Sequence, residues 1–360
     1  MSRFWVPRTW IILAGVAFGV LAAMATKWGN PPNMGICIAC FYRDIAGGLG
    51  LHQATVVQYL RPEIMGFMLG ALISAYGFGE FKARGGSSPI VRLILGALFM
   101  IGALVFLGCP VRALIRLAGG DLNGITALAG VVAGAAIGIY FLRRGLNLGP
   151  SLKIPTTVGW MMPLVMLGLL LLIIFQPSFL FFSEKGPGSM HAAIWISLLI
   201  GLFCGFLAQR TRMCFVGGWR DLILVGDSYL FGGIAGFFIG ALAVNLTLAY
   251  GFGEAQFFNV GFVGQPVAHD NHLWNFLGMA LAGLTATLLG GCPLRQTILS
   301  GEGNADAGVT VLGFIAGAAI AHNFHLASSP EGIGDFAVWA VIIGMAFCLA
   351  TGFLFSREKV

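Results

Sequence analysis

The chain has 360 residues, of which 58% are hydrophobic and only 9% are charged. Because soluble domains carry about a quarter charged residues, this composition excludes a single soluble core and indicates long segments that face lipid. Glycine is also frequent, with 54 residues, and in membranes it lets helices pack closely or break. The net charge of +6 is scattered along the chain, which argues against nucleic acid as a partner.

Hydrophobic segments recur along the whole chain. A bilayer core about 30 Å thick requires about 20 apolar residues per helix. The candidate spans are 10–25, 62–81, 92–107, 122–142, 158–182, 192–209, 229–252, 273–289, 307–325 and 336–355. We therefore predict an all-α integral membrane protein with about 9–10 transmembrane helices.

Basic residues cluster at the ends of alternate spans. The clusters are Arg3 with Arg8; Lys82, Arg84 and Arg92; Arg143, Arg144 and Lys153; Arg210 with Arg212; and Arg357 with Lys359. If both termini lie on the same side of the membrane, all of these clusters lie on that side as well. Cytoplasmic loops are enriched in lysine and arginine. We therefore expect cytoplasmic termini.

Two signatures occur twice, in the same order. Cys40-Phe41-Tyr42-Arg43-Asp44 is matched by Cys214-Phe215 followed, after three intervening residues, by Trp219-Arg220-Asp221. Gly108-Cys109-Pro110-Val111-Arg112 is matched by Gly291-Cys292-Pro293-Leu294-Arg295. We interpret the chain as a first transmembrane repeat over 1–155, a linking helix over 156–190, and a second repeat with a C-terminal helix over 191–360.

The two repeats are expected to be inverted, because the first half begins by crossing outward and the second by crossing inward. Inverted repeats with broken helices are typical of secondary transporters. The first span can also be read as a cleaved signal peptide, since basic residues precede an apolar run that ends in Ala23-Met24-Ala25. Its loss would leave the first repeat incomplete.

Four short helices are predicted beside the motif cysteines. Segments 36–50 and 213–225 are too short and too polar to span, so we expect re-entrant half-helices there. Helix breaks are expected at Gly108 and Pro110 and again at Gly291 and Pro293, because proline ends one helix and favours the first turn of the next. The positive ends of the new helices would face the centre of the fold.

The motif cysteines Cys40, Cys109, Cys214 and Cys292 are expected to line a substrate path. Protonated thiols give a sulfur-bearing or selenium-bearing anion several weak, soft contacts, which permeation requires. The structural alternative is a small buried hydrophobic residue, and we keep it for Cys204 and Cys348.

Four arginines beside these cysteines are expected to stabilise the anion, because arginine within a membrane is costly and usually functional. They are Arg43, Arg112, Arg220 and Arg295. Equally, they could anchor the short helices by pairing with Asp44, Asp221, Asp121 and Asp306. Arg116, Arg210 and Arg212 are expected to be interfacial anchors, and Glu63, Glu80 and Asp227 to lie near interfaces.

Other functional classes find less support. Cys37-Ile38-Ala39-Cys40 has the spacing of a thiol redox motif, so a membrane thiol oxidoreductase is an alternative, as is a purely structural subunit. The pairs His269 with His272 and His322 with His325 are expected to be loop or interface histidines rather than metal ligands. No glycine-rich nucleotide-binding loop is present, and we expect no cofactor and no enzymatic activity.

The segments from Cys40 to Gly48 and from Gly290 to Gln296 resemble the YeeE/YedE family of bacterial inner-membrane transporters. They are most similar to its YedE branch of selenium transporters. The resemblance implies an hourglass-like fold that imports thiosulfate or a related ion. It also implies path thiols at Cys40, near the outer entrance, and at Cys109 and Cys292, and a cytosolic sulfur-carrier partner of the TusA type. The Cys37 to Cys40 pair and the longer segment 27–35 depart from the family pattern, which leaves the entrance and the choice of sulfur or selenium open.

Overall fold

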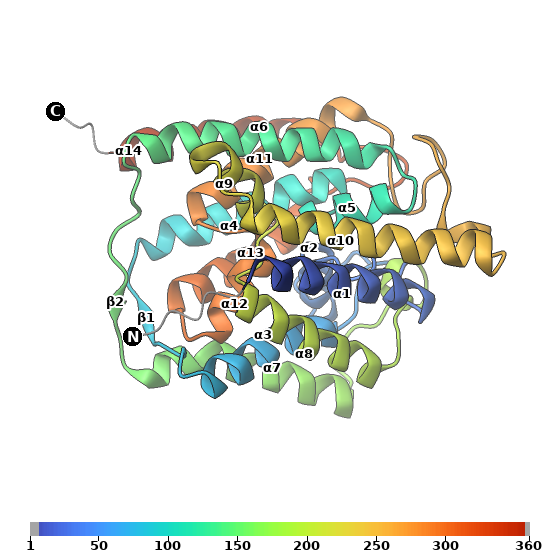
Figure 1. Ribbon diagram of the computed structural model, residues 1–360, viewed down its shortest axis with the longest axis horizontal. Coiled ribbons are helices and arrows are strands. Elements are labelled where there is room, and N and C mark those ends of the chain that lie inside the picture. The colour runs from blue at the N-terminus through green and yellow to red at the C-terminus, as the bar shows by residue number, and fades with distance from the viewer. Residues whose placement is uncertain (1–6, 357–360) are drawn as a thin grey trace.

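The computed structural model describes residues 7–356 and is almost entirely helical (Figure 1). Arg3, Arg357 and Lys359 lie outside the described residues. The helices are α1 (Arg8–Lys27), α2 (Ile38–Gly48), α3 (Pro62–Gly77), α4 (Pro89–Phe106), α5 (Pro110–Ala118), α6 (Asn123–Arg143), α7 (Thr156–Phe175), α8 (Ile194–Thr211), α9 (Gly217–Val225), α10 (Tyr229–Leu246), α11 (His272–Leu289), α12 (Pro293–Gly301), α13 (Ala305–Asn323) and α14 (Ala337–Phe355). The strands β1 (Arg84–Gly85) and β2 (Leu152–Lys153) form a short antiparallel ribbon.

The predicted membrane spans are confirmed as helices. Within the described residues, nine helical stretches are long and apolar enough to cross a bilayer, and two of these join a long helix to the short one after it, Pro89–Ala118 and His272–Gly301. The tenth predicted span is α3, which has 16 residues. The chain is therefore an all-α, multi-pass membrane protein.

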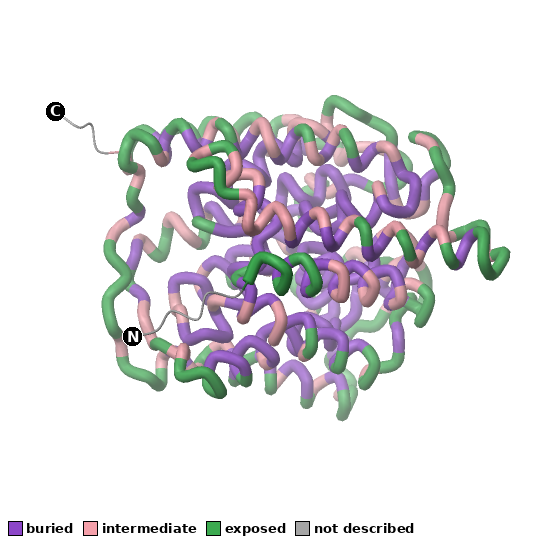
Figure 2. The backbone as a smooth tube through the Cα atoms, viewed as in Figure 1, coloured by how far each residue is buried: buried purple, intermediate pink, exposed green. Residues whose placement is uncertain are grey.

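The four predicted short helices are also confirmed, as α2, α5, α9 and α12. The breaks before α5 and α12 have the same construction: a left-handed residue, Leu107 or Gly290, ends the long helix, and Pro110 or Pro293 begins the short one. Proline suits a first turn because its missing N–H has no partner there. All residues of α2 are buried, and Figure 2 shows that buried residues concentrate in the middle of the molecule.

The long helices pack in pairs that each join the two halves: α1 with α10, α3 with α8, α4 with α13 and α6 with α11. The contact is close because glycines face backbone: a Cβ on Gly15 would lie 2.2 Å from the carbonyl oxygen of Gly233, and one on Gly19 would lie 2.0 Å from that of Phe237. Residue numbers rise together across this contact, so α1 and α10 run parallel.

Corresponding helices of the two halves run in opposite directions. The end of α1 meets the start of α8, where the Asn30 side chain accepts a hydrogen bond of 3.0 Å from the Ala192 backbone. Trp28 and Ile196, near these two ends, and Ala17 and Phe203, farther along each helix, line one crevice between α1 and α8. Since α1 and α8 each open one half, this antiparallel contact is the geometry of an inverted repeat.

Two boundaries differ from the prediction. The span expected over 158–182 ends at Phe175, because Gln176 adopts a left-handed conformation (φ 45°) and precedes Pro177, which disfavours helix at the residue before it. The span expected over 229–252 is α-helical only to Leu246 and continues as a π-helical turn, Thr247–Gly251.

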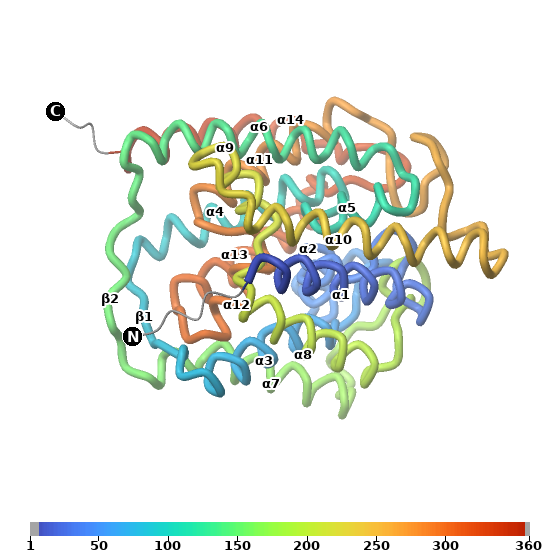
Figure 3. The backbone as a smooth tube through the Cα atoms, viewed as in Figure 1, coloured from blue at the N-terminus to red at the C-terminus, as the bar shows by residue number. Residues whose placement is uncertain are grey.

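The described basic clusters gather at one end of the molecule. Arg84 and Lys153 are partners in the β ribbon, and Arg210 pairs with Glu80 at 3.3 Å. The Asn147 backbone after α6 donates to the carbonyl of Phe355 at the end of α14 (3.1 Å). Figure 3 shows β1, β2 and the end of α14 at the same end of the molecule.

Candidate functional site

Three free thiols meet in the first half. Cys37 precedes α2, Cys40 lies in its first turn, and Cys109 precedes α5. The sulfur of Cys37 lies 3.1 Å from that of Cys40 and 3.7 Å from that of Cys109. All three side chains are buried. The fold thus concentrates polarisable sulfur at the point where two short helices begin.

Arg112 brings a positive charge to this cluster. Its guanidinium lies 3.4 Å from the sulfur of Cys40 and donates to the backbone carbonyls of Asn33 (2.8 Å), Val267 (2.9 Å) and Leu107. The side chain is fully buried. Among the described residues no carboxylate lies within 4 Å of it, since each ion pair found involves another arginine or lysine. A buried cation without an acidic partner is costly in a membrane, which makes Arg112 a candidate for anion binding.

The second half contains a matching pair of thiols. The backbone N–H of Cys292 donates to the sulfur of Cys214, and that of Phe215 donates to the sulfur of Cys292, each at 3.4 Å. Both cysteines are free and buried. The Tyr42 hydroxyl on α2 lies 2.8 Å from that of Thr297 on α12, so the short helices of the two halves are directly connected.

The correspondence between the halves differs from the one predicted. Cys37 accepts a hydrogen bond from the N–H three residues later, at Cys40 (3.4 Å), and Cys214 accepts one from the N–H three residues later, at Gly217 (3.1 Å). Each also contacts the cysteine of its own half that precedes proline.

The spacing agrees with this geometry. Arg43 follows Cys37 by six residues, as Arg220 follows Cys214. The alignment of Cys40 with Cys214 was therefore wrong: Cys37 is the counterpart of Cys214, and Cys40 occupies the position of Gly217. Aligning Cys37 with Cys214 requires no gap before the following arginine in either half, whereas aligning the two Cys-Phe dipeptides requires one.

The glycine before each motif cysteine allows the following arginine to fold back over the break. A Cβ on Gly108 would lie 2.5 Å from Cδ of Arg112, and one on Gly291 would lie 2.9 Å from Cγ of Arg295. At Gly108 and Gly291, a side chain would therefore collide with the following arginine. The Gly-Cys-Pro-aliphatic-Arg pattern is one structural unit, used once in each half.

Comparisons with known proteins agree with this arrangement. Residues 210–352, which include Cys214 and Cys292, match the model of a family described as "Sulphur transport". The second half of the chain is thus similar to this sulphur transport family.

Two curated relatives are named "Thiosulfate transporter TsuA". The protein from Spirochaeta thermophila is 34% identical over 125 residues, which cover 35% of this chain and 35% of the relative. The protein from Escherichia coli is 24% identical over 136 residues, which cover 38% of this chain and 36% of the relative. The matched region thus spans about a third of each relative's length. These names and the family description are those of transport proteins, not of enzymes.

The other motif arginines are ion-paired. Arg43 pairs with Asp44 at 2.7 Å, Arg220 pairs with Asp221 at 2.7 Å, and Arg295 pairs with Glu302 at 3.1 Å. Among the four arginines predicted to stabilise an anion, Arg112 therefore differs from the rest. The pairing of Arg43 and Arg220 with the next residue agrees with the anchoring alternative.

Other predicted partners are different in the structure. Asp121 pairs with Arg116 rather than with Arg112, and Asp306 accepts from the backbone of Gly86 (2.8 Å) and Ser87 (3.0 Å) rather than from Arg295. The expectation that Arg116 is an interfacial anchor is wrong, because its side chain is fully buried. Spacing along the chain could not show which acid folds back onto which arginine.

Two buried charged residues were missed. Arg61 is fully buried and donates to Asp44 at 2.8 Å, so that Asp44 binds two arginines. Glu63 was expected near an interface but is fully buried, where one of its oxygens accepts from Asn30 (2.9 Å) and Ser197 (2.8 Å). Both residues flank Pro62 at the start of α3. This charged pair beside a helix-starting proline was the only feature of the sequence that could have indicated a buried polar cluster there.

The remaining candidates take structural positions. Cys204 and Cys348 are buried in α8 and α14 without another thiol at hydrogen-bond distance. His269 lies 2.8 Å from the carbonyl of Val105, and His322 stacks on His52 with ring centres 4.5 Å apart. Within residues 7–356 no group of three or more histidine, cysteine or acidic side chains is arranged to hold a metal ion.

Proposed function

We propose that this protein imports a small sulfur-bearing or selenium-bearing oxyanion of the thiosulfate type across the bacterial inner membrane. The proposed path is lined by Cys40, Cys109, Cys214 and Cys292, and the corrected correspondence between the halves adds Cys37. Thiosulfate suits such a path because it carries charged oxygens at one end and a soft sulfur at the other. The names of the two relatives support this substrate class.

The observation that carries the proposal is the uncompensated charge of Arg112 beside three buried thiols. Charged oxygens of the ion would accept from the guanidinium, since arginine binds oxyanions through several donors at once. Its terminal sulfur would contact the thiols of Cys37, Cys40 and Cys109, which are weak donors. Contacts of this strength orient an ion without trapping it, as permeation requires.

The proposal includes a topology. The repeats over 1–155 and 191–360, with the linker 156–190, would form two halves of an hourglass-like protein whose termini lie in the cytoplasm. The clustering of basic residues at one end supports this orientation, because positively charged loops remain cytoplasmic. A cytosolic sulfur-carrier protein of the TusA type, as the family resemblance implies, would receive the imported sulfur.

The choice between sulfur and selenium is proposed to depend on Cys40. The second half has Gly217 at the corresponding position, so this thiol is not needed to build the short helix. Cys40 also contacts Arg112 directly, so an ion bound there would meet charge and thiol together. We therefore expect Cys40 to change the preference between thiosulfate and its selenium analogue, selenosulfate.

Uptake of radiolabelled thiosulfate into proteoliposomes tests the proposal. Cys109→Ala and Cys292→Ala are each expected to lower the initial rate about fivefold, because each removes a thiol contact of about 1 kcal/mol. Cys204→Ala and Cys348→Ala are matched controls, since they remove equally buried thiols outside the motifs, and both should keep the normal rate. Normal rates in Cys109→Ala and Cys292→Ala would refute the thiol path.

A further inference from the structure

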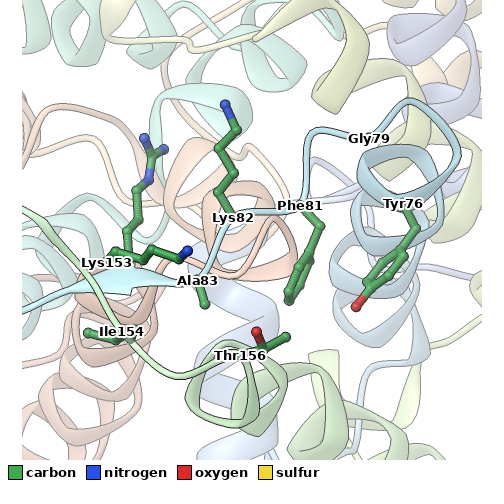
Figure 4. Close-up of a pocket in the computed structure, with 9 residues that line it drawn as sticks. Tyr76, Gly79, Phe81, Lys82, Ala83, Lys153, Ile154 and Thr156 are labelled. Carbon is green, nitrogen blue, oxygen red and sulfur yellow. The ribbon is translucent and has the colours of Figure 1, made fainter.

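A second cationic site lies away from the thiols, at the end of the molecule that carries the β ribbon. A cavity of about 650 Å³ is lined by the loop after α3 and by β2. Its lining includes three basic residues, Lys82, Arg84 and Lys153, together with Tyr76 and Phe81. Figure 4 shows the side chains of Lys82, Lys153, Tyr76 and Phe81 around this cavity.

The basic residues share one face of the ribbon. Arg84 and Lys153 are direct cross-strand partners, and Lys82 precedes Arg84 by two residues, which places alternate side chains of an extended segment on the same side. Like charges directly opposite each other destabilise a strand pair. An anion bound between Arg84 and Lys153 would therefore stabilise the ribbon.

Nearby acidic residues are already engaged. Glu302 pairs with Arg295. Asp306 accepts from the backbone of Gly86 and Ser87 and from the Ser151 hydroxyl (3.0 Å). Within residues 7–356, no carboxylate lies within 4 Å of the side-chain nitrogens of the three cavity cations.

The other half shows that the fold does not need these cations. The N–H groups of Lys82 and Arg84 donate to the carbonyls of Glu302 and Gly303, which precede α13. The same bonds occur at the opposite end, where Asn259 and Gly261 donate to Gly119 and Gly120 before α6.

Asn259 and Gly261 thus occupy the places of Lys82 and Arg84 and carry no charge. Backbone hydrogen bonds alone hold each loop against the turn before α13 or α6. The lysine and arginine side chains at the first loop are therefore free to bind a ligand.

Aromatic residues place the cavity at the level of lipid headgroups. The Trp160 indole donates to the Tyr76 hydroxyl at 2.9 Å, and both rings pack against Phe81. Tryptophan and tyrosine concentrate at membrane interfaces, and basic pockets between transmembrane helices on the cytoplasmic side bind anionic headgroups. We propose that this cavity binds a phosphate oxyanion, supplied by the headgroup of an anionic phospholipid.

The test measures binding of short-chain phosphatidylglycerol, phosphatidylcholine and inorganic phosphate to the full chain in detergent. Each basic residue near a membrane surface contributes measurably to anionic lipid binding, so the triple variant Lys82→Gln, Arg84→Gln and Lys153→Gln should bind phosphatidylglycerol about 100-fold more weakly. Lys185→Gln removes a basic residue outside the cavity and should bind normally. Arg84→Lys keeps the charge and should retain most of the affinity.

The outcomes separate the two sources of phosphate. Phosphatidylglycerol bound more tightly than phosphate, with loss of binding in the triple variant, supports a lipid site. Phosphate bound as tightly as the lipid, with the same loss, supports the oxyanion site with a free ion as its ligand. Equal phosphatidylglycerol binding by the normal chain and a folded triple variant, checked by size-exclusion chromatography, would overturn the proposal.

Discussion

The two thiol sites share a backbone construction but differ in charge. In each half a cysteine accepts from the N–H three residues later and contacts the cysteine that precedes proline. In the first half Arg112 meets this site without an acidic partner, whereas in the second half Arg295 is paired with Glu302. The duplicated fold thus provides two similar sites, of which one is positively charged and the other is neutralised.

In the proposed transport, this difference would separate capture of the ion from its release. An uncompensated cation favours capture of an anion, and a neutralised site binds it more weakly and allows release. Conduction needs both properties along one path. We expect the first-half site to determine capture and the second-half site to determine release, and the predictions below test this comparison.

The largest effect is expected when the second-half ion pair is broken. Arg295→Met leaves the Glu302 carboxylate buried without its cation and should lower the free energy of unfolding by about 3–5 kcal/mol. Denaturation of the purified protein in mild detergent measures this. The double variant Arg295→Met with Glu302→Gln should recover most of the lost stability. Equal stabilities of the single and double variants would show that the pair is not a significant contributor.

Arg112→Lys should affect transport more than stability. Lysine keeps the charge but cannot reach the carbonyls and Cys40 with one planar group. Loss of one hydrogen bond to a charged group, about 1.5–3 kcal/mol, predicts a roughly tenfold to hundredfold lower uptake at low thiosulfate concentration. Unchanged concentration dependence of uptake would refute the role of Arg112 in capture.

Substitution of Cys37 and of Cys40 should separate the role that both halves share from the role that only the first half has. Cys37→Ala removes the counterpart of Cys214 and should lower thiosulfate uptake about fivefold, because a thiol contact of about 1 kcal/mol is lost. Cys40→Gly restores the residue found at the matching position of the second half and should leave thiosulfate uptake within about threefold. Competition by selenosulfate should change mainly in Cys40→Gly. The reverse order of effects would support the alignment of Cys40 with Cys214.

The smallest effect is expected at a partly exposed ion pair that the two halves also share. Arg210 at the end of α8 pairs with Glu80, three residues after α3, and Lys27 at the end of α1 pairs with Glu254, three residues after the π-helical turn. Exposed pairs of this kind contribute about 0–1 kcal/mol. Glu80→Gln and Glu254→Gln should therefore each lower the free energy of unfolding by less than about 1 kcal/mol.

The Glu80 pair has a defined pH dependence. Partial burial would raise the pKa of Glu80, but the hydrogen bond from Gln209 and the charges of Arg210 and Arg212 outweigh it and lower the pKa below 4.5. The stabilising effect of this carboxylate is therefore complete above pH 4.5 and is lost as the pH falls through its folded pKa. The stability difference between the normal chain and Glu80→Gln should vanish at low pH.

Much of the fold could be predicted from local patterns. Apolar runs located the spans, and proline after cysteine located α5 and α12, because hydrophobic length and proline geometry act within a few residues. The end of α7 was misplaced since the apolar run continues beyond Pro177, where hydropathy and backbone preference disagree. The missed burial of Arg61 and Glu63 has another cause, because burial depends on which helices cover the start of α3.

By itself, the sequence determined the membrane class, the duplication and the cysteines and arginines beside the helix breaks, since composition and repeated motifs are properties of the chain. Only the tertiary structure decided that Cys37 is the counterpart of Cys214, that Glu302 neutralises Arg295 and that Arg112 has no acidic partner among the described residues. The Arg295–Glu302 pair depends on how the chain turns back after α12, and the surroundings of Arg112 depend on distant segments that meet at Asn33 and Val267. Charge compensation in particular is a property of three-dimensional neighbours, and spacing along a sequence does not determine it.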